Sequence, residues 1–145
     1  MTRMRAWFVV AATLAMMVAV VSSPASADDV GANDFRISDL GPDGNISYSA
    51  AVSAVAYNPV NDRYLVVWYG DDNSASLVDG EFEIFGQLID ADGASIGQDF
   101  RISDMGPDGI TSYFAANPAV AHNPDHNEFL VVWYGDDNTA PLVDN

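Results

Sequence analysis

Two acidic turns carry the side chains in this sequence that are best suited to chemistry. Each turn has the composition Asp-Asp-Asn and follows an apolar run, and the residues are Asp71, Asp72, Asn73, Asp136, Asp137 and Asn138. Side-chain oxygens grouped in this way suit calcium, which takes six to eight oxygen ligands, backbone carbonyls included. A solvated loop that caps a strand is the commoner origin of such a turn, and calcium is the specific alternative that we carry forward.

Two further groups of residues resemble metal sites less closely. Asp90–Gly93 begins like a calcium loop, but Ala94–Ile96 follows without the further acidic ligands that such loops contain. The Asp-Gly pair within this segment is a strong signal for a tight hairpin, and we predict a type I′ turn there. His122 and His126 are separated by a turn rather than spaced along a helix, so we expect no metal pair.

No group of residues forms a catalytic pattern. Cysteine and lysine are absent, there is no Gly-rich phosphate loop, and neither of the two histidines recurs in the repeat described below. Nucleophilic and phosphoryl-transfer chemistry therefore have no candidates. Paired carboxylates can hydrolyse glycosidic bonds, but no pair stands out among 21 acidic residues. We expect no enzyme, and a glycan-acting hydrolase is the alternative.

Aromatic residues offer a second route to glycans. Trp68 and Tyr69 in one apolar run, and Trp133 and Tyr134 in the other, could stack on sugar rings as in a lectin. Aromatic residues in the middle of apolar strands belong more often to the core, so we expect core positions. An oligomeric lectin remains an alternative.

Residues 1–27 have the three parts of a secretory signal peptide. Arg3 and Arg5 form a basic start, an apolar run follows, and small residues at Ala25 and Ala27 precede Asp28. This pattern predicts cleavage after Ala27 and export, so that the protein is secreted, extracellular or on the cell surface. The apolar run is short for a bilayer span, and we expect no membrane span after cleavage.

The processed chain is strongly acidic. Three arginines and 21 acidic residues remain after cleavage, which gives a net charge of −18. Such a charge would repel nucleic acid and anionic membranes, so we expect neither as a partner. Because there is no cysteine, an exported domain of this size must depend on its core, on metal or on neighbouring copies.

The acidic turns belong to a larger repeat. Residues 34–80 align without a gap with residues 99–145, an offset of 65, and about two-thirds of the aligned positions are identical. We therefore divide the chain into a signal peptide (1–27), a short linker (28–33) and a repeat region (34–145). The repeat region contains a first repeat at 34–98 and an incomplete second repeat at 99–145.

Each repeat is predicted to contain four short strands. The first repeat has strands at Ser53–Tyr57, Tyr64–Tyr69 and Phe82–Ile89 and a fourth strand that ends near Ile102, and Asp34–Ser38 matches the end of that fourth strand. Both faces of Leu65–Tyr69 are apolar, so this strand is expected to be covered on both sides. No segment after the signal peptide has a helical period, which predicts an all-β fold of antiparallel four-stranded units.

The strand pattern and several phrases resemble β-propeller repeats. Ala54–Pro59, Tyr64–Trp68 and Glu83–Gly93 are similar to repeats of large exported bacterial proteins related in style to the integrin-α and FG-GAP type. The resemblance implies β-propeller-type blades, about one and a half of them here, in a binding or surface module.

These observations together predict an exported, non-enzymatic binding or surface-interaction protein, a fragment or short relative of a larger propeller. We expect a protein or glycan ligand, calcium as the only candidate cofactor, and either further blades or a homo-oligomer. Since Asn145 aligns with Gly80, directly before a strand is due, we expect the processed chain either to be marginally stable as a monomer or to associate through strand exchange into a ring-like oligomer.

Overall fold

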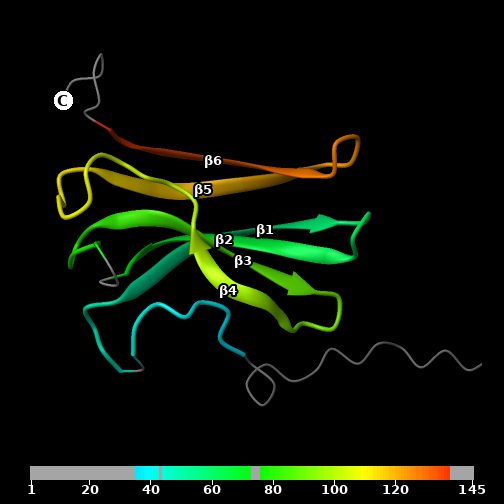
Figure 1. The fold of residues 1–145 in the computed structure, drawn as a ribbon, viewed down its shortest axis with the longest axis horizontal. Coiled ribbons are helices and arrows are strands. Elements are labelled where there is room, and N and C mark those ends of the chain that lie inside the picture. The colour runs from blue at the N-terminus through cyan, green and yellow to red at the C-terminus, as the bar shows by residue number, and fades with distance from the viewer. Residues whose placement is uncertain (1–34, 43, 73–75, 138–145) are drawn as a thin grey trace, which may run out of the picture. The chain divides into compact units, whose positions relative to one another are not determined.

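All regular secondary structure in the described part of the chain is β-strand. The computed structural model describes residues 35–42, 44–72 and 76–137. The strands are β1 (Ser49–Asn58), β2 (Arg63–Asp71), β3 (Phe82–Asp90), β4 (Ser95–Arg101), β5 (Phe114–Asn123) and β6 (Glu128–Asp136) (Figure 1). No helix occurs in these residues, so the prediction of an all-β fold is confirmed.

The strands form two antiparallel sheets. The first sheet has the order β1-β2-β3-β4, and the second contains β5 and β6. Every connection within the first sheet joins neighbouring strands, so the sheet is a simple meander. Among the described residues, none form a helix of the length and apolar character needed to cross a membrane.

The second sheet reproduces the first two strands of the first sheet. The bounds of β5 and β6 lie 65 residues after those of β1 and β2, and the pairing registers agree. Both pairs contain a β-bulge at the same place, between Ala51 and Ala54 in one copy and between Ala116 and Ala119 in the other. The sequence repeat is therefore also a repeat in backbone structure.

Short hydrogen-bonded turns connect the strands. The Asn58 side chain accepts hydrogen bonds from Val60 N at 2.9 Å and from Asn61 N at 3.2 Å, as expected for an Asn-Pro turn between two strands. The β3–β4 hairpin lies where it was predicted, but its turn differs. Only Gly93 has positive φ, at 88°, whereas a type I′ turn requires two such residues, so the loop is a turn followed by a left-handed glycine.

Strand β2 is the centre of the first sheet and separates two groups of core residues. Leu65 and Val67 point to one side, where they pack with Ile84 of β3. Trp68 points to the other side and packs with Phe85 and with Leu40 from the segment before β1. The prediction that this strand is covered on both faces is confirmed for Leu65, Val67 and Trp68, whereas Val66, on the Trp68 side, is only partly buried.

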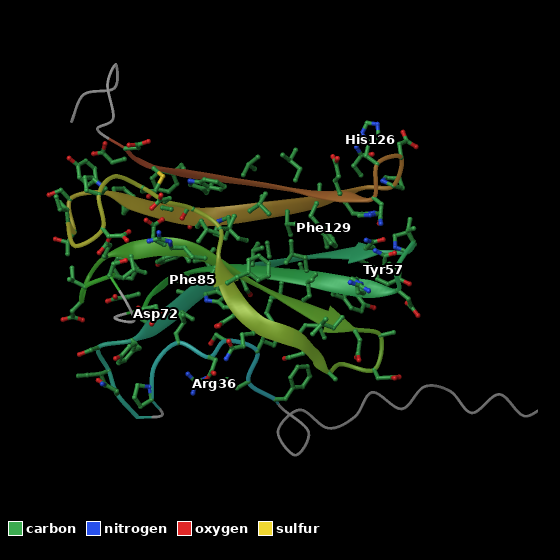
Figure 2. All side chains as sticks on the ribbon, in the orientation of Figure 1. Arg36, Tyr57, Asp72, Phe85, His126 and Phe129 are labelled. Carbon is green, nitrogen blue, oxygen red and sulfur yellow. The ribbon has the colours of Figure 1, made fainter. Side chains whose placement is uncertain are left out.

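The second sheet covers the Leu65 side of the first sheet. Strand β5 contacts β1, β2 and β3. Phe129 (Figure 2), Val120 and Val131 pack against the buried cluster that contains Leu65. The two copies thus stack face to face.

Two expectations for the repeat are wrong. Residues 35–38 of the expected strand Asp34–Ser38 form no strand, and Asp34 lies outside the described residues. In the first sheet β4 pairs with β3, and the residues 65 positions before β3 are 17–25. Those residues lie within the expected signal peptide, so residues 34–38 have no predicted partner strand. The apolar run in β6 was also expected to be covered on both faces. Its face that points away from the first sheet is exposed, because nothing in the described residues covers it.

Candidate functional site

The two predicted acidic turns lie at the ends of corresponding strands. Asp71 is the last residue of β2 and Asp72 follows it (Figure 2), while Asp136 is the last residue of β6 and Asp137 follows it. Asn73 and Asn138 lie outside the described residues. The repeat therefore places each acidic pair at the same end of its strand.

Asp71 is a buried carboxylate that is only half satisfied. Its Oδ2 atom accepts a hydrogen bond from Gly80 N at 2.7 Å, whereas its buried Oδ1 atom has no hydrogen-bond partner. Burial raises the pKa of Asp71, and the nearby charges of Asp79, Asp72 and Glu81 raise it further against the effect of the Gly80 hydrogen bond. A raised pKa means that the fold disfavours the ionised form of this side chain.

Glu81 is a second buried carboxylate in the same region. Its Oε2 atom accepts hydrogen bonds from Val78 N at 3.1 Å and from Gly109 N at 2.9 Å, and its buried Oε1 atom has no partner. Gly109 belongs to the segment that leads into β5. Glu81 therefore links its own loop to the second repeat through these hydrogen bonds.

Glu83, the second residue of β3, has a similar role. Its Oε1 atom accepts a hydrogen bond from Met105 N at 2.8 Å, and its Oε2 atom accepts one from the Ser103 hydroxyl. Burial raises the pKa of Glu83 despite these hydrogen bonds. The sequence analysis missed this role, because a glutamate that alternates with apolar residues in a strand is typical of a solvent-facing position.

These carboxylates do not assemble into a metal centre within the described residues. No three Asp, Glu or His side chains in the described ranges come together in a way that could hold a metal ion. The Asp90 carboxylate is used by its own hairpin, where it accepts hydrogen bonds from Asp92 N at 3.0 Å and Ala94 N at 2.8 Å. Calcium binding at the Asp-Asp-Asn turns stays a prediction, which calorimetric titration with CaCl2 tests.

The most distinctive surfaces are two apolar sheet faces on opposite sides of the stack. The Leu130 face lies on β6 and consists of Leu130, Val132 and Tyr134, which are 63%, 51% and 57% exposed. The Val55 face lies on β1 and β2 and consists of Val55, Tyr57 and Tyr64, which are 60%, 44% and 38% exposed. Large apolar side chains gathered on one face commonly mark an interaction site.

A groove continues the Val55 face toward the segment before β1. It has a volume of about 390 Å³, and its walls include Phe35, Ile37, Ala50, Val66 and Trp68. Trp68 is only 3% exposed, and its buried indole N–H has no hydrogen-bond partner. The core position predicted for this tryptophan is confirmed.

The tryptophan of the second repeat differs. Trp133 is 37% exposed, so the core position expected for it is wrong. Leu142 aligns with Leu77, which helps to bury Trp68, and it lies outside the described residues. Trp133 and Tyr134 are neighbours in a strand and point to opposite faces, so they do not form one sugar-stacking platform.

Comparisons with models of known protein families, with curated proteins and with solved structures found no match.

Proposed function

We propose that this chain is an exported, non-enzymatic repeat protein that acts as a binding or surface-interaction module. In this proposal the two repeats are β-propeller-type blades related in style to integrin-α and FG-GAP repeats, and the protein is secreted, extracellular or at the cell surface. Its four-stranded antiparallel meander has the strand order of a propeller blade, which supports this interpretation.

One observation carries the proposal. Leu65 and Val67 are 4% and 0% exposed, whereas their counterparts Leu130 and Val132 in the second repeat are more than half exposed. The same residue types are therefore buried in the first repeat and exposed to solvent at the equivalent positions of the second repeat. An exposed apolar face of this kind suits a protein that functions by contact.

Dye binding tests whether the native protein presents this face. Nile red is a suitable probe because it is neutral, while the chain's negative charge would repel an anionic dye. At low protein and salt concentrations, where the chain is monomeric, we expect the native chain to enhance Nile red fluorescence and Leu130→Arg to reduce the enhancement. Ile110→Arg is the matched control, since Ile110 is 41% exposed in a loop and aligns with the polar residue Asn45. Absence of dye binding by the native chain would overturn the proposal.

Export is tested separately by expressing residues 1–145 in a bacterial host. We expect a secreted or periplasmic product whose first residue is Asp28, as determined by N-terminal sequencing. An uncleaved product that stays with the cells would contradict this part of the proposal.

A further inference from the structure

We propose that the Leu130 face of one molecule docks onto the Val55 face of a second copy of this chain. The docking repeats the packing that already joins the two repeats within each molecule. This inference rests on the proposed function, because it names the partner of the exposed faces.

The interface within the chain defines the geometry. On the first repeat, Leu65 and Val67 form the side that receives the second sheet. On the second repeat, Val120, Phe129 and Val131 form the side that packs against them. The two sides are different surfaces, and every repeat carries one version of each.

Each exposed face is the repeat counterpart of one side of this interface. Leu130 and Val132 take the places of Leu65 and Val67, with identical residue types. On the other side, the counterparts of Val120, Phe129 and Val131 are Val55, Tyr64 and Val66, so two are identical and one aromatic ring replaces another. Both surfaces that meet inside the chain are therefore also present on its outer sides, where the described residues leave them largely exposed.

The groove supports the same pairing. Three of its lining residues, Ile37, Ala50 and Val66, have as counterparts Ile102, Ala115 and Val131. All three counterparts belong to the cluster between the two sheets, and Ala115 is fully buried there. The groove is thus the uncovered version of a surface that is covered in the second repeat.

A hydrogen bond adds a specific contact to this model. Asn58 Nδ2 donates to Asn127 Oδ1 at 2.8 Å, which links the β1–β2 turn to the β5–β6 turn. The repeat counterparts of these residues are Asn123 and Asp62. We therefore place Asn123 of one molecule against Asp62 of the next, where the carboxylate can accept the amide hydrogen bond.

The assembly is head-to-tail, because the two docking faces differ. Such contacts are heterologous and form rings where the rotation closes and filaments where it does not. Charge opposes the association, since copies of the chain processed after Ala27, with a net charge of −18, repel each other. Salt screens this repulsion, with the Debye length falling from about 8 Å at 0.15 M to about 3 Å at 1 M, so association should strengthen as salt rises.

Two charged variants test the polarity of the assembly. Leu130→Arg blocks one face and Val55→Arg blocks the other, and both positions are exposed, so neither change should disturb the fold. Sedimentation velocity is measured on the chain expressed from its full sequence and purified from the exported fraction. We expect the unsubstituted chain and the Ile110→Arg control to associate, each blocked variant to remain monomeric, and an equimolar mixture of the two to form a heterodimer. The mixture restores one compatible pair of faces.

Other outcomes overturn the proposal. A Val55→Arg protein that dimerises alone would show that two Leu130 faces meet, and blocked variants that assemble normally would indicate pairing through strand edges. An unsubstituted chain that stays monomeric up to high salt would also refute self-docking. In that last case Nile red binding shows whether the apolar face is still presented, so failure of this inference is distinguished from failure of the proposed function.

Discussion

Alanine substitutions at Leu65 and Leu130 should have very different effects on stability, although the two leucines are repeat counterparts. Leu65 is 4% exposed and packs between the sheets, whereas Leu130 is 63% exposed. Leu→Ala at a buried site costs about 2–5 kcal/mol, and we expect about 3 kcal/mol for Leu65 because its neighbours come from two sheets and cannot collapse easily. At Leu130 the expected cost is below about 0.5 kcal/mol.

Urea unfolding followed by tryptophan fluorescence measures this difference. The protein concentration must be low, so that self-association does not stabilise the folded chain. A loss of about 3 kcal/mol corresponds to a melting temperature lower by roughly 10–15 °C in a domain of this size. Equal costs at the two positions would refute the reasoning, since they would show that the Leu130 face is covered in the monomer.

Three further substitutions test individual contacts. Val52→Asn should raise the free energy of unfolding by about 1 kcal/mol in urea titrations. Val52 has a φ of 46°, which is unfavourable for valine, and the equivalent bulge of the second repeat has Asn117, with a φ of 51°, at this position. Destabilisation would contradict this. Gly70→Ala should lower the melting temperature, at a cost of about 1–3 kcal/mol, because a Cβ atom would lie 2.5 Å from Leu40 Cδ1 and 2.7 Å from Ser49 O. Asp71→Asn should be more stable than the unsubstituted chain at neutral pH and equal to it below pH 3.8. Burial raises the folded-state pKa of Asp71 above 3.8, its ordinary value in the unfolded chain. The unsubstituted chain therefore loses stability as the pH rises from 3.8 to the folded-state pKa. A difference in stability that does not change with pH would exclude this explanation.

Much of the strand pattern could be predicted from local sequence. The apolar run at β2 and the Asn-Pro turn after β1 depend on residues close together in the chain, so periodicity and turn chemistry locate them. The bulge at Val52 was not predicted, because a valine with positive φ contradicts its own preference. Its counterpart Asn117, a residue that tolerates such a backbone, was the available signal.

Burial on β6 and the roles of the glutamates could not be predicted in the same way. Leu65 and Leu130 each begin the same nine-residue sequence, and only the sheet that lies against one of them separates a core residue from a surface residue. Likewise, Glu81 and Glu83 look like surface acids until the backbone N–H groups of Gly109 and Met105 are brought to them. Such contacts join segments more than 20 residues apart, which local patterns do not specify.

Site-directed cross-linking tests the central claim most directly. The chain contains no cysteine, so an Asp62→Cys protein and an Asn123→Cys protein each carry a single thiol. Mixed at high salt with a short thiol-specific cross-linker, the two proteins should form the heterodimer in excess over either homodimer, as identified by mass spectrometry of the cross-linked peptides. Asn58→Cys with Asn127→Cys in one chain is the control, and it should cross-link within the molecule because those side chains already share a hydrogen bond. Heterodimers and homodimers in statistical proportion, alongside an efficient control, would contradict head-to-tail docking.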